Sequence, residues 1–516
     1  MQEPITESVN VDEEQNIVAS NSVYGFLRMG SKFFVSFLLS ILLVRFLGPT
    51  NYGVYTVAVL YWGFASTFSS LGLGSTIMYG VARYRAKDRK GLINWVISHY
   101  FIVLMVSSSV ASVALFAVSG PLAVIYRTPS LAEYIRILAI GVIFYSINDN
   151  FTTAVFTGSQ KLKYGFITGV IYDVLRIVQL VVVYIGFGLL GAIAMYDVTY
   201  LVIATIGLFF VYRIFRLNSA KDRPEAAELS HLKHYSAFSY TGSLISTLYG
   251  PVITLFLGAV AANMSDVSFY RVGLIMVGML GMPANIIGSA FFSSITKFFE
   301  KRDLVNFYML EKRLLKYSVL ITIPFVVASL ISIRQLISYL YRSSFLSVQT
   351  PFVILIVPVI LTAIFGPLTQ ILSATGKQKY WMYSVVAGAV VGLVSTLVLV
   401  PRFSAVGAAE AYTLVSITML VLNLAFLNRL RIISFSKSIP YLDLAKGFVS
   451  AALMGIFLYY ALAFVATLSL LPWILILSLF VYFGLLYATR TITRHDMSFF
   501  VKLLRADKFI RAFYKR

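Results

Sequence analysis

The sequence predicts an all-α protein that crosses a membrane about fourteen times. Of its 516 residues, 59% are hydrophobic and only 12% are charged, and the mean hydropathy is +0.85. A soluble protein carries about twice that share of charged residues. The chain also contains apolar stretches of the roughly 20 residues that a helix needs to cross a bilayer. Strand-length alternation is absent, and backbone groups in lipid must be hydrogen-bonded within their own segment, so these stretches are predicted to be helices.

Fourteen such stretches are predicted as membrane spans. In chain order they cover residues 22–46, 52–80, 91–118, 130–157, 164–187, 190–212, 236–258, 267–295, 317–338, 349–375, 380–400, 404–427, 445–467 and 471–490. The segment before the first span is polar and acidic and has neither a basic region nor a small-residue cleavage site. We therefore expect no cleaved signal peptide.

The basic residues predict the orientation of the chain. With the N-terminus in the cytoplasm, 32 of the 42 Lys and Arg residues fall on the cytoplasmic connections and the C-terminal tail. Short cytoplasmic loops carry such an excess, so we predict a multi-pass plasma-membrane protein with both termini in the cytoplasm. The net charge of +21 then reflects topology and contact with anionic lipid headgroups, and no nucleic acid is expected as a partner. Residues 494–516 are predicted to form a basic amphipathic helix on the inner leaflet.

An internal repeat predicts two lobes. Three short motifs recur at offsets of 210, 218 and 216 residues: Phe46–Gly48 with Phe256–Gly258, Thr157–Lys161 with Thr375–Lys379, and Gly191–Tyr196 with Gly407–Tyr412. A shift of six spans preserves orientation, so the halves are expected to be parallel repeats related by an axis along the membrane normal. The predicted organisation is an acidic cytoplasmic tail (1–20), an N-lobe (21–217), a cytoplasmic linker (218–235), a C-lobe (236–430), two further spans (431–493) and the basic tail (494–516).

Four segments carry a resemblance to a known family. They are LLVRFLGPTNYGVYTVAVL (42–60), TGSQK (157–161), GLLGAIAMY (188–196) and SFYRVG (268–273). Together they resemble the polysaccharide-transporter, or O-antigen flippase, branch of the multidrug/oligosaccharidyl-lipid/polysaccharide (MOP) exporter superfamily, over roughly residues 20–430. The resemblance implies two six-helix lobes in a V around a central cavity, which move polyprenyl-(pyro)phosphate-linked sugars across the membrane by alternating access. The last two spans resemble the extra pair of lipid II flippases.

Basic residues at membrane depth are candidates for binding such a substrate. Charged groups are costly in hydrocarbon, so each one indicates a functional role or a local partner. Arg28 and Lys32 lie four residues apart, hence on one face of the first span, and that span contains no acid. They would hold the carrier phosphate, unless they extend to the inner headgroups instead. Arg176 and Arg271 are two further candidates for the cavity, and Arg176 could alternatively pair with Asp173.

Four acidic residues within spans are candidates for ion coupling: Asp149, Asp173, Asp197 and Glu410. A carboxylate in a cavity can bind Na⁺ or a proton and so couple transport to an ion gradient. The alternative for each is a hydrogen-bonded packing role. The chain has no cysteine, and its four histidines are scattered, so neither a metal site nor a bound cofactor is expected.

Two other functions are compatible with a polytopic membrane protein. A membrane glycosyltransferase or polymerase needs catalytic groups on sizeable outer loops, whereas the outer connections here are short, so we do not expect an enzyme. A cation-coupled multidrug antiporter of the same superfamily is the nearer alternative, although two bases in the first span favour an anionic substrate. The expected partners are the lipid-linked oligosaccharide, membrane lipids, and glycan polymerases or glycosyltransferases.

Overall fold

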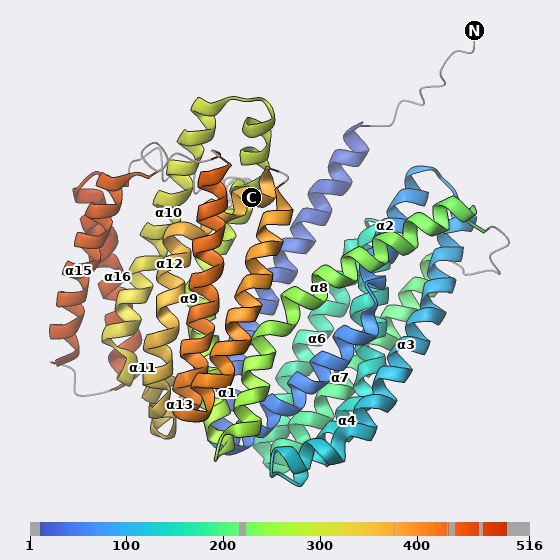
Figure 1. The fold of residues 1–516 in the computed structure, drawn as a ribbon, viewed down its shortest axis with the longest axis horizontal. Coiled ribbons are helices and arrows are strands. Elements are labelled where there is room, and N and C mark those ends of the chain that lie inside the picture. The colour runs from blue at the N-terminus through green and yellow to red at the C-terminus, as the bar shows by residue number, and fades with distance from the viewer. Residues whose placement is uncertain are drawn as a thin grey trace, which may run out of the picture. The chain divides into compact units, whose positions relative to one another are not determined.

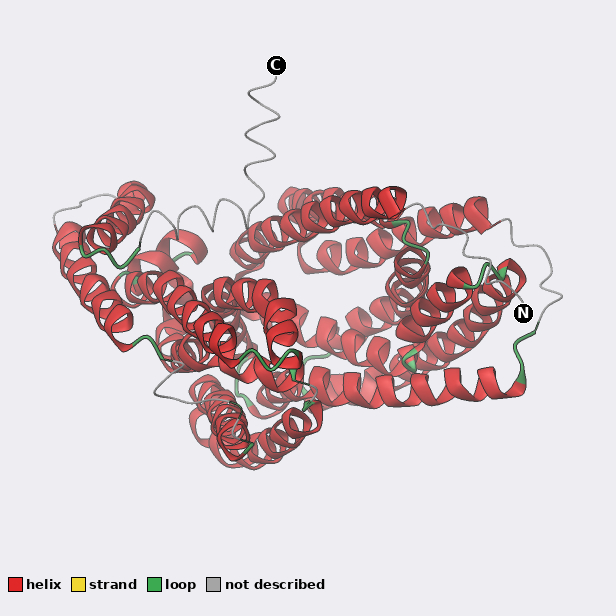
Figure 2. Ribbon diagram, turned by 90° about the horizontal axis from the view of Figure 1, so that it is seen from above, coloured by secondary structure: helices red, strands yellow, loops and turns green. Residues whose placement is uncertain are grey.

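The computed structural model describes residues 11–215, 223–375, 377–430, 432, 439–463 and 468–492. In these ranges every regular element is a helix, and no strand occurs (Figure 2). Ten helical stretches among the described residues are long and apolar enough to cross a membrane. The prediction of an all-α polytopic membrane protein is therefore confirmed.

The chain divides into two compact units, Met1–Ser268 and Phe269–Arg516 (Figure 1). The helices of unit 1 are α1 (Val11–Ser70), α2 (Leu73–Ala86), α3 (Lys90–Ile125), α4 (Ser130–Tyr145), the π-helix η1 (Ser146–Thr152), α5 (Thr153–Gly158), α6 (Leu162–Val182), the π-helix η2 (Val183–Phe187), α7 (Gly188–Phe215) and α8 (Ala226–Val260). Helix α9 (Met264–Glu300) begins just before the boundary at Ser268, so most of it belongs to unit 2.

The rest of unit 2 is also helical. It contains α10 (Leu304–Ile331), α11 (Ile333–Tyr341), the 3₁₀-helix η3 (Ser343–Val348), α12 (Gln349–Ala374), α13 (Gln378–Arg429), α15 (Tyr441–Ala463), the 3₁₀-helix η4 (Leu468–Leu470) and α16 (Leu471–Ala488). The basic tail predicted at 494–516 lies outside the described residues. Helix α1 already begins at Val11, within the acidic segment predicted at 1–20.

Several long helical stretches each contain two predicted spans. Gly48 in α1 has a φ of 73°, a left-handed conformation that glycine adopts without strain, and it turns the chain just before Pro49. Gly186 interrupts the run from α6 to α7 in the same way, and Ser404 interrupts α13. Two other predicted spans are broken in the structure. The span 52–80 is interrupted between α1 and α2, and the span 317–338 at Ser332, between α10 and α11.

Helix α8 belongs to unit 1, because it packs along α1 and α2. Near its C-terminal end, the carbonyl oxygen of Leu255 accepts a hydrogen bond of 2.8 Å from the Tyr126 hydroxyl. Farther along the chain, the Ser268 hydroxyl donates to the carbonyl of Pro49. The observed division at Ser268 therefore lies one helix later than the predicted linker at 218–235.

In unit 2, helices α15 and α16 pack against α10. They share a buried apolar cluster that includes Leu320 of α10, Met454 of α15 and Tyr482 of α16. The Tyr482 hydroxyl also donates a 2.9 Å hydrogen bond to the Leu320 carbonyl. The opposite faces of the pair carry exposed apolar side chains, among them Trp473 and Phe480, at 69% and 71% exposure. Such a surface is suited to lipid.

We expect Gly447→Val to destabilise this packing. Gly447 of α15 lies so close to α10 that a Cβ atom there would collide with the Leu320 side chain. Overpacking of this kind costs about 1–3 kcal/mol, which thermal unfolding of the purified protein in detergent would detect as a lower midpoint. Gly484→Val on α16 is the control, because a Cβ at Gly484 meets no atom within 4 Å. Equal midpoints for the two variants would contradict the packing described here.

Candidate functional site

Helix α6 carries a row of buried polar side chains on one face. Asp173, Arg176 and Gln179 follow one another at intervals of three residues, and all three are buried. This spacing places them on one face of the helix. That face lies against α7, where the carbonyl of Ala192 accepts a hydrogen bond from the Gln179 side chain. The apolar residues of α6 at the other positions, such as Val174 and Val181, are exposed.

Arg176 is the buried cation of this row, with 9% of its surface exposed. Its guanidinium carbon lies 4.7 Å from the centroid of the Tyr196 ring and 6.0 Å from that of Tyr172. Aromatic faces attract a cation, and the attraction grows as water is excluded. None of the described residues accepts a hydrogen bond from Nε or Nη1 of Arg176. Two nitrogen atoms of the guanidinium are therefore buried without an acceptor among the described residues.

Aromatic rings from four helices surround this part of α6. The Trp62 ring of α1 lies 4.8 Å from Tyr145, 4.9 Å from Tyr196 and 5.3 Å from Tyr200, measured between centroids. Tyr172 joins the group through Tyr200, at 5.7 Å. We call these five residues the aromatic cluster. Its rings meet edge-to-face or tilted, the arrangements that aromatic pairs prefer, and two of them, Tyr172 and Tyr196, lie against Arg176.

A cavity of about 50 Å³ adjoins the aromatic cluster. It is lined by Asn148 and Asp149 of η1, by Thr168, Gly169, Tyr172 and Asp173 of α6, and by Tyr200 and Ile203 of α7. The Asn148 side chain donates a 3.0 Å hydrogen bond to Asp149. Single turns of π-helix inside α-helices are frequent at functional sites. The volume suits one ion or water molecule, and two carboxylates with amide and hydroxyl oxygens are the ligands that hard cations prefer.

A third acid, Asp197 of α7, lies at the contact with α4. The two helices approach so closely that a Cβ atom at Gly141 would collide with the Asp197 carboxylate. Its buried Oδ1 atom has no hydrogen-bond partner of normal geometry among the described residues, and the same is true of the nearby Trp62 indole nitrogen. Asp197 thus contacts the aromatic cluster from the side of α4.

A larger groove in unit 1, of about 200 Å³, shares two residues of the aromatic cluster. Its walls come from α1, α4 and α8, and comprise Leu60, Trp62, Gly63, Phe64, Ser66, Thr67, Tyr145 and Pro251. A groove lined by aromatic rings and hydroxyl groups is suited to a ligand that has both an apolar face and polar groups.

The structure brings together some of the predicted residues and leaves others apart. Asp149 and Asp173 line one cavity, Arg176 follows one turn later on α6, and Asp197 lies near the same aromatic cluster. Arg271 on α9 and Glu410 on α13 are half-buried and belong to unit 2. Helix α1 includes positions 28 and 32, but the side chains of Arg28 and Lys32 lie outside the described residues.

Sequence reasoning missed the aromatic cluster and one buried acid. Tyr196 and Tyr200 are four residues apart on α7, and this spacing could have indicated a shared face. Glu311 was assigned to a cytoplasmic connection, yet it is fully buried in α10. Among the described residues, no group of three or more His, Asp or Glu side chains could hold a metal ion.

Comparison with known proteins identifies the family. The model of the polysaccharide biosynthesis protein family matches residues 18–299, more than half of the chain. The chain belongs to this family. The family's relatives include an uncharacterized membrane protein of Methanocaldococcus jannaschii, 23% identical over 448 residues, which cover 82% of this chain and 85% of that protein.

Solved structures show that this polysaccharide biosynthesis protein has the fold of the MOP superfamily. The lipid II flippase MurJ, in an inward closed conformation, matches with a TM-score of 0.70 and 12% identity over 89% of this chain and 98% of the flippase. An inward-facing multidrug resistance MATE transporter matches with a TM-score of 0.60 and 16% identity, over 77% and 94% of the two chains. The fold that the resemblance to the MOP superfamily implies is therefore confirmed.

We predict that Gly141→Ala and Asp197→Ala are energetically coupled. An added methyl at Gly141 displaces the Asp197 carboxylate, whereas in the Asp197→Ala background the space is free. The double-mutant cycle, measured as thermal unfolding of the purified protein, is expected to give a coupling energy of about 1 kcal/mol or more. Gly120→Ala on α3, where a Cβ meets no atom within 4 Å, corrects for the intrinsic helix propensity of alanine. Additive effects would show that the two helices do not meet at this point.

Proposed function

We propose that this protein translocates a polyprenyl-(pyro)phosphate-linked oligosaccharide across the plasma membrane by alternating access, for the synthesis of a cell-surface glycan. One observation carries the proposal: Arg176 is a buried cation with two nitrogen atoms, Nε and Nη1, whose N–H groups no described residue accepts. Burying a charge in the membrane costs free energy, so a buried cation without a protein partner indicates a role in binding a ligand. The family description as a polysaccharide biosynthesis protein and the likeness to a lipid II flippase support the same function.

The proposed substrate has a phosphate and a sugar, and unit 1 offers a feature for each: a buried cation for the phosphate and an aromatic groove for the sugar. A phosphate on a lipid carrier must cross about 30 Å of hydrocarbon, so its path has to supply fixed positive partners. A guanidinium can bind it through two parallel hydrogen bonds. Arg28, Lys32, Arg176 and Arg271 are the cations that we assign to this path. The groove beside Trp62 and Tyr145 offers aromatic faces and hydroxyls for a sugar ring.

The cavity lined by Asp149 and Asp173 is the site that we propose for the coupling ion. Its lining includes two carboxylates, its volume suits one Na⁺ ion, and protonation of either carboxylate would serve a proton gradient equally well. Asp197 and Glu410 are retained as further coupling candidates. Arg176, one turn from Asp173, makes occupancy of this cavity sensitive to the charge of the substrate path.

A cation-coupled multidrug antiporter is the second candidate function. The observation that favours it is the same acidic cavity, together with the likeness to a MATE transporter. The two functions differ in the sign of the charge that they move. Efflux of a lipophilic cationic dye from proteoliposomes, with no flipping of a lipid-linked sugar, would favour the antiporter.

Replacing Arg28 by Ala is expected to abolish flipping. Loss of a charged hydrogen bond to the phosphate lowers the rate by at least about tenfold, and Arg28→Lys recovers only part of it because a point charge lacks the bidentate geometry. The measurement is flipping of a lipid-linked oligosaccharide in proteoliposomes with each variant present at wild-type level. Arg334→Ala, at an exposed arginine of α11, is the control. Normal flipping by the double variant Arg28→Ala, Lys32→Ala would contradict the assigned role.

We expect Asp149→Asn and Asp173→Asn to uncouple flipping from its ion gradient. Each amide removes a negative charge from the cavity, so the affinity for Na⁺ falls and the substituted residue can no longer carry a proton. Flipping rates measured with imposed Na⁺ or pH gradients separate the two ions. Glu133→Gln, an exposed acid in the first turn of α4, is expected to retain the wild-type response. Unchanged gradient dependence in both Asn variants would exclude this cavity.

A further inference from the structure

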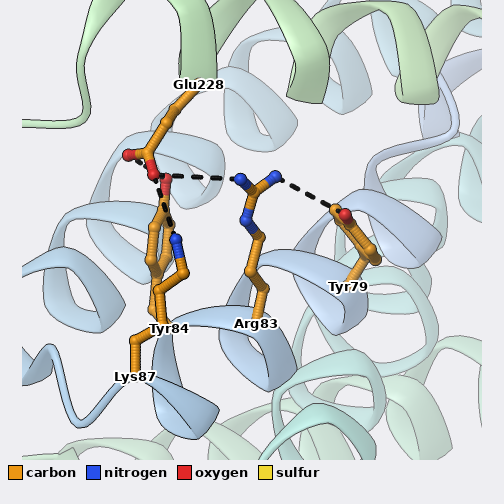
Figure 3. A network of polar contacts seen from close by, with 5 residues as sticks. All are labelled: Tyr79, Arg83, Tyr84, Lys87 and Glu228. Carbon is orange, nitrogen blue, oxygen red and sulfur yellow. Dashed lines mark hydrogen bonds and ion pairs between the residues drawn. The ribbon is translucent and has the colours of Figure 1, made fainter.

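Helix α8 is attached to α2 by a cluster of polar contacts on one glutamate. The Glu228 carboxylate lies 3.9 Å from Arg83 Nη2 and 3.7 Å from Lys87 Nζ, and it accepts a 3.2 Å hydrogen bond from the Tyr84 hydroxyl. Figure 3 shows the three donors directed toward the carboxylate: Arg83 and Tyr84 come from the last turn of α2, and Lys87 caps that helix. Arg83 also approaches the Tyr79 hydroxyl, at 3.5 Å. The connection at the end of α2 is the one that the basic residues predict to be cytoplasmic.

The donors form an anion site whose occupant is part of the chain. Burial and the Glu228 charge raise the pKa of Tyr84 to about 12, so its hydroxyl keeps its proton and donates. The side chains of Arg83 and Lys87 are 28% and 47% exposed, whereas that of Glu228 is 15% exposed. An anion arriving from the solvent or the headgroup layer can therefore reach both cations. A phosphate carries more charge and more acceptor oxygens than a carboxylate, so it competes well for these donors.

The same contacts position the N-terminal half of α8. At intervals of four residues from Glu228, Leu232 is buried, the Ser236 hydroxyl donates to the Leu71 carbonyl at 2.7 Å, and the Tyr240 hydroxyl donates to the Phe68 carbonyl at 3.3 Å. This face thus lies along the end of α1 and the start of α2. Among these contacts, those of Glu228 are the charged ones.

Farther along α8, Gly250 and Pro251 supply a point at which the helix can bend. Proline removes one helical hydrogen bond, and the space beside Gly250 is open, because a Cβ there meets no atom within 4 Å. Pro251 also lines the groove that contains Trp62 and Tyr145. Release of the N-terminal half of α8 would widen this groove at the end near Thr67.

We propose that Arg83 and Lys87 form an entry site for a phosphate group, and that Glu228 is an internal competitor that holds α8 closed until phosphate displaces it. The inference rests on the proposed function, since the phosphate of a lipid carrier is the ligand for which such a site would open. Free phosphate and a phosphorylated headgroup share the required chemistry. Displacement of Glu228 then frees α8 and opens the groove to the sugar.

The test measures the position of α8 without any sugar substrate. The chain has no native cysteine, so Ala86→Cys on α2 and Ala226→Cys on α8, both exposed, can carry a pair of spin labels in the full-length protein. In phosphatidylcholine nanodiscs we expect one short distance. Inorganic pyrophosphate, or nanodiscs that contain phosphatidic acid, should raise the population of longer distances about fivefold, whereas NaCl at equal ionic strength should not. A response to pyrophosphate indicates that free phosphate suffices, and a response to phosphatidic acid alone indicates a headgroup site.

Substitutions distinguish competition between Glu228 and phosphate from a general loss of structure. Glu228→Gln is expected to populate the longer distances without phosphate and to bind pyrophosphate about fivefold more tightly, because the competitor is gone. The double variant Arg83→Gln, Lys87→Gln should lose pyrophosphate binding. The charge-swapped variant Glu228→Arg, Arg83→Glu should keep the short distance between the spin labels, which Glu228→Gln loses. Glu225→Gln, an exposed acid at the start of α8 whose side chain makes no capping hydrogen bond, is the matched control.

Two results would overturn the proposal. One is a distance distribution that changes with neither pyrophosphate nor phosphatidic acid. The other is an unchanged pyrophosphate affinity in Glu228→Gln. Neither outcome depends on flipping. Failure of the flipping assay with a normal phosphate response would therefore reject the proposed function and leave this site in place.

Discussion

Burying the cation of Arg176 among helices is the constraint on which the rest of unit 1 depends. An unpaired guanidinium in a low-dielectric interior is unstable unless neighbouring groups compensate its charge. The rings of Tyr172 and Tyr196 contribute a cation–π attraction of about 0.5–2 kcal/mol, and the carboxylates of the adjoining cavity lower the local potential. This compensation leaves Nε and Nη1 without acceptors. Two nitrogen atoms of this buried group thus have no acceptor, and this is the observation on which the proposed substrate role of Arg176 rests.

Close approach of helices is the second requirement, and small residues make it possible. Without hydrophobic driving force between helices in lipid, packing relies on van der Waals contact, which glycine permits at short range. Gly141 brings α4 against Asp197 of α7, and Gly447 brings α15 against α10. The equivalent repeat positions Gly191 and Gly407 each lie against the turn or helix that precedes them, in unit 1 and in unit 2 respectively. At this one motif of the sequence repeat, a close packing contact of the glycine recurs.

Helix α8 links the charge at the end of α2 to the groove in the middle of unit 1. Its C-terminal part is held by neutral hydrogen bonds, such as that from Tyr126 to Leu255, whereas its N-terminal part is held by a partly exposed ionic cluster in addition to the hydrogen bonds of Ser236 and Tyr240. Ionic contacts near the surface are weak and respond to competing ions, while buried neutral contacts do not. The two ends of α8 consequently differ in how readily they separate from α1 and α2. A helix with this asymmetry can open at one end without leaving the unit.

The sequence by itself determined the helical, membrane-spanning class of this protein and the charged residues inside its spans. Hydropathy and length require helices, because no other open structure satisfies backbone groups in lipid. The spacing of Asp173 and Arg176 also determined that they share one face of α6. Periodicity, however, describes one helix at a time, and it contains no information on which faces of different helices meet.

Only the tertiary structure decided that Asp149 and Asp173 line one cavity, and that five aromatic residues from α1, α4, α6 and α7 form one cluster, of which Tyr172 and Tyr196 lie against Arg176. It also decided that α8 belongs to unit 1, one helix beyond the predicted linker. Each of these facts depends on the rotation and spacing of neighbouring helices. Rotation and spacing follow from the packing of many side chains at once, such as the contact of Gly141 with Asp197, and no single segment of the chain encodes them.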